Sequence, residues 1–249
     1  MKLLFVFLYF LPSITLFAQD EEKEPTQRSA DYHESRSRLS TPPYSLAKIK
    51  ALIGKIKPVN NESDSDEQEE KLDDKKYQGL SVREKFTYNM INPESYSQNC
   101  DGFPPVYDEE KKIFGNLPDP FGEYHWGERQ RKFFAANKDS AIALMSESIE
   151  RSGKAGLNYK RVIVDIQAVE MIPLLIETYK KEKGQKDLDI LTLFMLLMKK
   201  SKYDGFVKSA SYRKLYDSNS NYMSYINFNT ANEDLIIQRV TSFYNASKK

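Results

Sequence analysis

The sequence predicts an all-α, compact domain of about six to eight helices, and three observations support this fold class. Apolar residues recur at helical spacing through most of the chain from Tyr77 onward. Capping boxes, in which Ser or Thr is followed by Glu three residues later, stand before such segments at Ser81 and Thr230. The β-branched run 159–167 suits a strand or a helix, and we expect a helix because no second strand-like run lies nearby to pair with it.

Residues 1–18 have the pattern of a cleaved signal peptide. A short basic start, Met1-Lys2, is followed by the apolar run 3–17, and the small residue Ala18 suits a cleavage site. The run is shorter than the roughly 20 residues that a membrane span needs, and Pro12 interrupts it. We therefore expect export to the periplasm or the medium, with an uncleaved N-terminal anchor as the alternative.

Composition divides the remaining chain after residue 76. Of the 31 aromatic residues, 24 lie from Tyr77 onward, whereas residues 20–76 contain only Tyr32 and Tyr44. The early segment is also rich in charge, and such a segment buries too little apolar surface to offset the entropy lost on ordering. We expect a flexible, disordered acidic tether over residues 19–76 and a helical domain over residues 77–249.

The helices of this domain follow one another with a single long interruption. The first is expected to begin after Ser81 and to end at Asn92, which precedes a proline. The Pro- and Gly-rich segment 99–124 then predicts a long ordered loop, a kind of segment that is often functional. Helical spacing resumes and continues over the segments 126–137, 139–153, 169–184, 187–202 and 230–248.

One pair of segments indicates how neighbouring helices pack. The run from Leu188 to Met198 is apolar almost all round but too short to cross a bilayer, so we expect it to be the buried central helix. Together with the preceding segment, which carries Pro173 near its start, it resembles a unit of the HEAT-type helical repeats. The resemblance covers roughly forty residues without a second copy at a fixed period, and it implies paired helices.

The tether contains one conditional amphipathic helix, at about residues 45–57. At about 100° per residue its aliphatic side chains share one arc, outside which Lys48 and Lys55 lie. Such a helix packs on its own domain, in the groove of a partner protein or on an anionic membrane. A membrane is the least favoured because the stripe lacks Trp and Phe and acidic residues follow it. The residues of the stripe are Leu46, Ile49, Leu52, Ile53 and Ile56.

Few catalytic chemistries remain open to the domain. The chain has no GxGxxG, GxxxxGK[ST], GxSxG, HExxH or CxxC motif. His125, the one histidine of the domain, has Glu123 and Glu128 close in sequence and is the only candidate general base. Alternatively, His125 and Trp126 anchor the loop against the next helix. Cys100 is expected to be a buried thiol, although a nucleophile–base pair with His125 is the alternative.

These observations favour a non-catalytic, exported interaction or scaffold protein. Its contact elements would be the apolar stripe and the aromatic loop that runs from Phe103 to Trp126, and its partner another extracytoplasmic protein. The net charge of +1 argues against nucleic acid as a partner, and one His with scattered acids argues against a metal or other cofactor. An extracytoplasmic hydrolase that uses His125 with Glu123 or Glu128 is the second interpretation. A membrane-surface protein that uses residues 45–57 is the third.

Overall fold

The computed structural model describes residues 23–56, 67–69, 71–98 and 103–248. Within these ranges the chain forms twelve α-helices, two 3-10 helices and five short strands, so the prediction of a mostly helical domain is confirmed. The helices outnumber the six to eight expected because three of them are very short and two more lie in the segment assigned to the tether. The predicted signal peptide, residues 1–18, lies outside the described residues.

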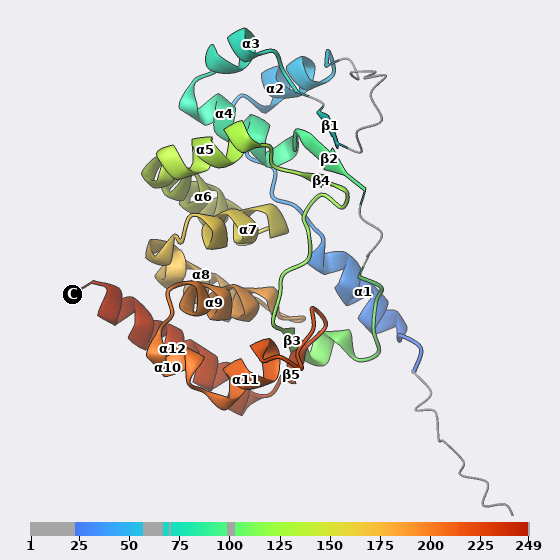
Figure 1. The fold of residues 1–249 in the computed structure, drawn as a ribbon, viewed down its shortest axis with the longest axis vertical. Coiled ribbons are helices and arrows are strands. Elements are labelled where there is room, and N and C mark those ends of the chain that lie inside the picture. Colours follow the sequence, from blue (N-terminus) through green and yellow to red (C-terminus); the bar gives the residue numbers. More distant parts are fainter. Residues whose placement is uncertain (1–22, 57–66, 70, 99–102, 249) are drawn as a thin grey trace, which may run out of the picture.

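Seven helices form a stack that runs the length of the molecule (Figure 1). Within it α4 and α5 pack against α6, α6 packs against α8, α7 and α8 pack against α9, and the last helix, α12, packs against both α8 and α9. The stack consists of α4 (Val82–Ile91), α5 (Glu128–Ala136), α6 (Lys138–Ser152), α7 (Leu157–Asp165), α8 (Ile172–Lys181), α9 (Asp189–Lys200) and α12 (Thr230–Ser247). The short helices are α3 (Asp74–Gln78), α10 (Asp204–Val207), α11 (Ala210–Tyr216), η1 (Glu109–Lys111) and η2 (Val169–Met171).

The strands form two small antiparallel sheets at the edge of the stack. In one, β2 (Ser95–Ser97) pairs with both β1 (Glu67–Glu69) and β4 (Tyr124–His125). In the other, β3 (Lys112–Phe114) pairs with β5 (Tyr225–Asn227), with Ile113 opposite Ile226. The predicted loop 99–124 thus contains a 3-10 helix and a paired strand in its described part, residues 103–124.

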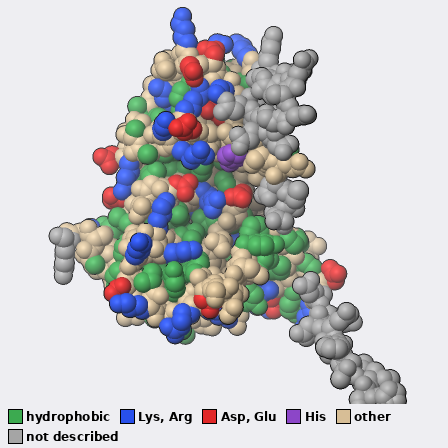
Figure 2. All heavy atoms as spheres, viewed as in Figure 1, with side chains coloured by type: hydrophobic (Ala, Val, Ile, Leu, Met, Phe, Trp, Pro, Cys, Tyr) green, Lys and Arg blue, Asp and Glu red, His purple; other side chains and the backbone are tan. Residues whose placement is uncertain are grey.

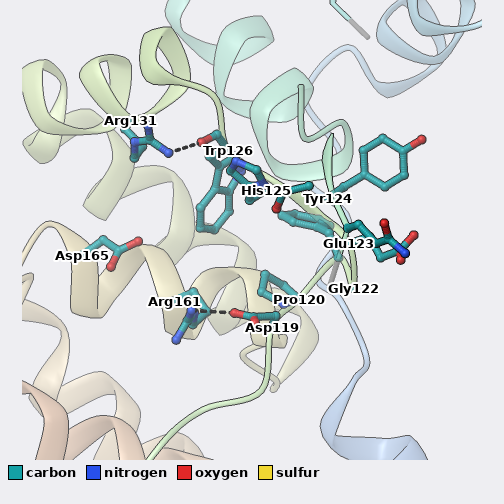
Figure 3. Close-up of a pocket in the computed structure, with 13 residues that line it drawn as sticks. Asp119, Pro120, Gly122, Glu123, Tyr124, His125, Trp126, Arg131, Arg161 and Asp165 are labelled. Atoms are coloured by element: carbon teal, nitrogen blue, oxygen red, sulfur yellow. Dashed lines mark hydrogen bonds and ion pairs between the residues drawn. The ribbon is translucent and has the colours of Figure 1, made fainter. Parts of the chain in front are cut away.

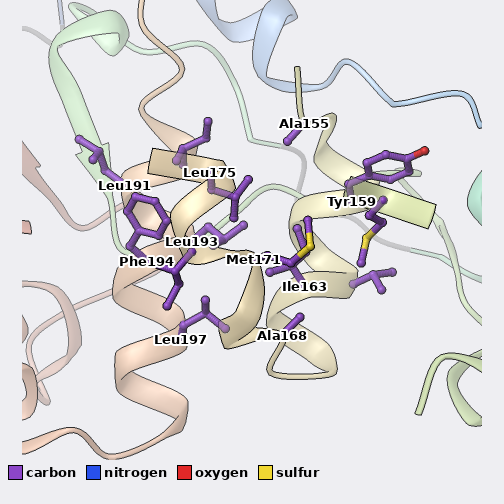
Figure 4. Packing of buried hydrophobic residues seen from close by; sticks show 14 of the residues in the cluster. Ala155, Tyr159, Ile163, Ala168, Met171, Leu175, Leu191, Leu193, Phe194 and Leu197 are labelled. Carbon is purple, nitrogen blue, oxygen red and sulfur yellow. The ribbon is translucent and has the colours of Figure 1, made fainter. Parts of the chain in front are cut away.

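The core lies between α7, α8 and α9 (Figure 4). Helix α9 buries nine of its twelve residues, which confirms the prediction of a buried central helix. The run 159–167, which was open between strand and helix, forms most of α7 and turns Tyr159 and Ile163 into this core. Its β-branched residues Val162 and Ile163 adopt a helix because they are buried in this core, where α7 packs on α9, rather than along a neighbouring strand.

Helix starts were predicted with mixed success. At α4, Ser81 and Glu84 form the expected capping box, with reciprocal side-chain to backbone hydrogen bonds. At α12 the prediction was wrong, because Asn229 caps the helix by accepting a hydrogen bond from the backbone N–H of Asn232. Asn is an equally good capping residue one position earlier, so Thr230 falls inside the first turn.

The prediction of a flexible tether fails for residues 23–56, which we call the N-terminal arm. The arm contains α1 (Gln27–Arg36) and α2 (Leu46–Ile53) and crosses the stack from η1 at one end to α4 at the other (Figure 1). Between the two helices, Tyr44 donates a hydrogen bond to the Leu144 carbonyl at 2.9 Å and its own carbonyl accepts one from Thr87 at 2.8 Å. The arm is ordered by contacts with distant residues, which its local composition does not reveal.

The middle of the arm is fastened to the start of α7. The Leu157 backbone N–H donates to the Arg38 carbonyl at 2.9 Å, and the Gly156 N–H donates to Ser40 Oγ at 2.8 Å. The Asn158 side chain bonds both the N–H and the C=O of Ser40. These contacts bring the two backbones so close that a Cβ atom on Gly156 would lie 2.1 Å from the Ser40 nitrogen. The approach therefore requires glycine at position 156.

Replacing Gly156 by alanine should loosen the arm. The φ of −66° at this position suits alanine, so the whole effect comes from the collision with residues 39–40. We expect a loss of about 1–3 kcal/mol in the free energy of unfolding and faster hydrogen exchange over residues 38–44. Gly79→Ala is the matched control, because its Cβ would meet only ordinary contacts of 3.4 Å or more at a φ of −70°. Equal effects of the two substitutions would contradict this role of Gly156.

Candidate functional site

The apolar stripe of the predicted interaction helix packs on the protein's own domain. Ile49 is fully buried in a cluster with Leu72, Tyr77, Leu80 and Tyr88, against which Leu52, Ile53 and Ile56 also pack. Leu46 is half-buried and Lys55 is exposed. Lys48 donates to Glu84 of α4 at 2.7 Å, and this hydrogen bond lowers the pKa of Glu84 to about 2. Of the three surfaces considered for this helix, the structure shows it packed on the protein's own domain, beside α4.

Ser45 precedes this helix but does not cap it with its side chain. It has a φ of +53° and its side chain makes no capping hydrogen bond. The helix runs from Leu46 to Ile53 and is thus shorter than the predicted 45–57.

The predicted acid–base residues do not converge. His125 lies on β4, exposed, and its imidazole makes no hydrogen bond with any described residue. Glu123 lines the same pocket as His125, but Glu128 lies on the surface of α5 and pairs with Lys132 at 2.7 Å. A general base needs an orienting partner, and none of the described residues orients His125. Cys100 lies outside the described residues, as does any pair it makes with His125.

Trp126 is a core residue rather than a surface contact. It is 7% exposed, donates its Nε1–H to the Asn89 carbonyl at 2.7 Å and meets Phe121 and Phe134 edge-on. The prediction that Trp126 contacts a partner protein is therefore corrected, because the indole is enclosed by the core and borders only a small pocket.

The pocket beside Trp126, which we call the Trp126 pocket, has a volume of about 450 Å³ (Figure 3). Its walls come from the end of β2, the 119–124 loop, β4, α5 and α7. Arg161 and Asp119 pair across one side at 2.7 Å. Loss of solvation raises the pKa of Asp165 above its ordinary value, although Arg161 and Lys200 act in the opposite direction.

A larger cavity lies beside the N-terminal arm, and we call it the arm groove. Its volume is about 1320 Å³, and it is bordered by α1, residues 38–40, the α6–α7 connection, α8 and the α8–α9 connection. Buried Ile149 and Ile190 contribute apolar surface, and the exposed Leu39 adds to it. The exposed cations of the rim are Arg28, Arg38, Lys154, Lys181 and Lys183, against the exposed acids Asp31, Glu150 and Glu177.

Lys160 gives the groove a charged floor. It is only 2% exposed and its Nζ lies 2.7 and 2.6 Å from the two carboxylate oxygens of Asp187. Burial raises the pKa of Asp187, while Lys160 acts to lower it. Asp187 is further held by its backbone N–H, which donates to Glu182 at 2.7 Å. These hydrogen bonds make this end of the groove polar and fix its side chains in the absence of a ligand.

The groove wall formed by α1 is held by a buried ion network centred on Arg36. Arg36 is 5% exposed, and it donates to Glu109 at 2.7 Å and to Asp189 at 3.0 Å. Its guanidinium also lies 4.5 Å above the ring of Phe114. His33 Nδ1 lies 3.0 Å from both oxygens of Glu109. The network joins the arm to η1 and to the first turn of α9.

Sequence reasoning did not identify Arg36, Glu109, Asp189 or Lys160. Arg36 is separated from its two carboxylate partners by 73 and 153 residues. A run of acids such as the one before β3 is typical of a solvated turn, yet Glu109 and Glu110 are both buried. The residues adjacent to a charged residue in a polar segment do not show that its ion-pair partner is distant in sequence and buried.

Neither the surface of the protein nor its comparison with known proteins indicates a specific function. On the face shown in Figure 2, Lys and Arg side chains are mixed with Asp and Glu, without a continuous surface of one charge. In the part of the chain that the structure describes, no His, Cys, Asp and Glu side chains cluster in a way that suits a metal ion, and no helix has the length and apolarity to cross a membrane. No protein-family model, curated protein or solved structure matches the chain.

Removing Arg36 should be strongly destabilising. Arg36→Ala leaves two buried carboxylates without their cation, and breaking a buried ion pair from one side costs about 3–5 kcal/mol in the free energy of unfolding. Arg38→Ala is the control, since its side chain is 66% exposed and its nearest carboxylate, on Glu34, is 3.9 Å away. We expect a change below about 1 kcal/mol there. Urea denaturation measures both, and similar losses would contradict the network's role.

The network should also make stability depend on acid pH. Burial raises the pKa of Glu109, but hydrogen bonds from His33 and Arg36 outweigh it and hold the pKa below its ordinary 4.5. A carboxylate with a lowered folded-state pKa stabilises the protein above its unfolded pKa, and this contribution is lost as the pH falls through the folded value. Urea denaturation from pH 7 downward should show Glu109→Gln losing less stability below about pH 4.5 than the wild type. If the free energy of unfolding of Glu109→Gln and of the wild type fell in parallel with pH, this role of Glu109 would be refuted.

Proposed function

We propose that this protein is an exported, non-catalytic interaction protein that binds an extended acidic segment of another extracytoplasmic protein in the arm groove. The observation that carries the proposal is Leu39, which is 41% exposed at the mouth of a groove with a cationic rim. Exposed apolar side chains beside a concave, charged surface are typical of protein interaction sites. Export is inferred from the signal-peptide pattern of residues 1–18.

The size of the groove supports a peptide rather than a small molecule. Sites for small ligands measure about 300–1,000 Å³, and the arm groove at about 1320 Å³ is larger. It borders the whole of α1 from Arg28 on, and a ten-residue helix is roughly 15 Å long. A strand-like peptide of several residues fits along such a length.

The charges of the rim support an acidic ligand. Five exposed cations face three exposed acids, and Lys154 and Lys183 have no ion pair within 4 Å among the described residues. Lys181 is paired with Glu177 on the same helix, so four exposed cations and two exposed acids remain outside this pair. A partner with Asp and Glu near an apolar side chain would match both the rim and Leu39.

The helical stack supports the scaffold part of the proposal. Consecutive helices α8 and α9 pack on each other and on α12, as HEAT-like helix pairing would require. Stacked helix pairs present extended concave surfaces, and proteins built in this way commonly bind other proteins along them.

The other two interpretations have weaker support. A hydrolase built on His125 lacks an orienting group among the described residues, and Glu128 is engaged with Lys132 away from the pocket. A membrane-surface role for residues 45–57 would require the stripe to leave α4, since Ile49 is fully buried there. No further observation favours either interpretation.

The proposal predicts binding of a defined acidic probe. A fluorescent peptide of about ten residues, rich in Asp and Glu with two Leu, should bind the protein with an affinity that falls with salt. A basic peptide of equal length should not bind. Lys154→Glu combined with Lys183→Glu should weaken the acidic peptide about tenfold, since reversed rim charges repel it. Fluorescence anisotropy measures each affinity.

Matched controls keep this test specific. Lys50→Glu combined with Lys75→Glu makes the same change in net charge on exposed lysines of α2 and α3, outside the groove. A photoreactive benzoylphenylalanine in place of Leu39 should cross-link the peptide, whereas one in place of Val82, which is 40% exposed on α4, should not. Equal weakening by both charge pairs, or equal cross-linking at both positions, would overturn the proposal.

A further inference from the structure

The Trp126 pocket differs from the arm groove in size and in the kind of charge it presents. At about 450 Å³ it falls within the range of small-ligand sites, about 300–1,000 Å³. It is lined by side chains of both signs, and three of them, Glu123, Arg131 and Asp165, have no ion pair within 4 Å among the described residues. Glu123 is exposed to solvent at the 119–124 loop, whereas Arg131 and Asp165 come from the helices α5 and α7 that form the wall.

The hydrogen bonds around Arg131 and Asp165 engage backbone carbonyls and leave the Asp165 carboxylate without a hydrogen-bond partner among the described residues. Arg131 directs one guanidinium N–H to the Trp126 carbonyl, which holds the side chain at the pocket wall. Asp165 is the last residue of α7, and the neighbouring Lys200 donates to the backbone carbonyls of Val164 and Asp165 rather than to the carboxylate. Both Arg131 and Asp165 face the same space in Figure 3. Each therefore has unused hydrogen-bonding capacity in one small cavity.

The helix ends around the pocket have the same polarity as the side chains. Arg131 lies in the first turn of α5, where the helix carries partial positive charge, and Asp165 ends α7, where the charge is partially negative. A ligand with an anionic group toward α5 and a cationic group toward α7 would be stabilised at both ends. A ligand with a single charge would leave one of the two side chains without a partner.

We infer that the Trp126 pocket binds a small zwitterion of the α-amino acid type. Its carboxylate accepts hydrogen bonds from Arg131, and its ammonium donates to Asp165. The rings of Phe121 and Trp126, whose centroids lie 5.4 Å apart, provide the apolar surface for the side chain of the ligand. This inference is independent of the peptide proposed for the arm groove, since none of its residues lines that groove.

The chain contains its own reporter for this site. Trp126 is its only tryptophan, so a change in intrinsic fluorescence on adding a ligand reports on this pocket. The probes are L-phenylalanine and L-leucine, with N-acetyl-L-phenylalanine lacking the ammonium and L-phenylalanine amide lacking the carboxylate. We expect at least one of the two amino acids to bind, and both blocked forms to bind about tenfold more weakly, as the loss of one charged hydrogen bond implies.

Two variants assign each end of the ligand to its residue. Arg131→Gln should weaken the free amino acid to the level of the amide, and Asp165→Asn should weaken it to the level of the N-acetyl form. Arg213→Gln and Asp139→Asn are the controls, because both residues are exposed and lie outside the pocket. Arg131→Gln also removes the hydrogen bond to the Trp126 carbonyl and can change the local structure. Asp165→Asn is nearly isosteric, so it tests the site without such a change.

Three results would overturn the inference. One is the absence of a fluorescence change with either amino acid up to about 10 mM, a limit that corresponds to negligible affinity. Another is equal binding of the blocked and free forms. The third is binding that both pocket variants leave unchanged while the protein remains folded by circular dichroism.

Discussion

The buried guanidinium of Arg36 is the contact on which the arrangement of the molecule depends. It lies between Glu109 at the 3-10 helix before β3 and Asp189 at the start of α9, so three segments distant in sequence meet at one side chain. Two carboxylates buried this deeply are unfavourable without a cation. The arm must therefore be in place for η1 and α9 to adopt these positions, and the arm groove has its α1 wall only when it is.

The parts of the fold that sequence predicts well are those determined by local patterns. The capping box of α4 and the apolar run of α9 each follow from residues within a few positions of one another. The arm shows the limit of this reasoning. Its low aromatic content indicates disorder, but Tyr32, Tyr44 and Ile49 are buried by partners that lie about 20 to 160 residues away.

The candidate sites likewise contain some features that local sequence predicts and others that depend on distant residues. His125 ends β4 and Trp126 lies between β4 and α5, and Glu123 shares a pocket with His125. The spacing of Glu128 did not bring it there, because the helix turns its side chain toward Lys132. Arg131, Arg161 and Asp165 complete the pocket from two helices, and no pattern within either helix marks them as neighbours.

The docked arm also bears on where a partner binds. To take the apolar stripe of α2, a partner would first have to separate Ile49 and its neighbours from α4, and exposing one such side chain costs about 1.5–3 kcal/mol. It would also break the Lys48–Glu84 hydrogen bond. The arm groove requires no such opening, because Leu39 and the rim cations are already exposed. For equal contacts, a partner therefore gains more free energy in the groove than on the stripe.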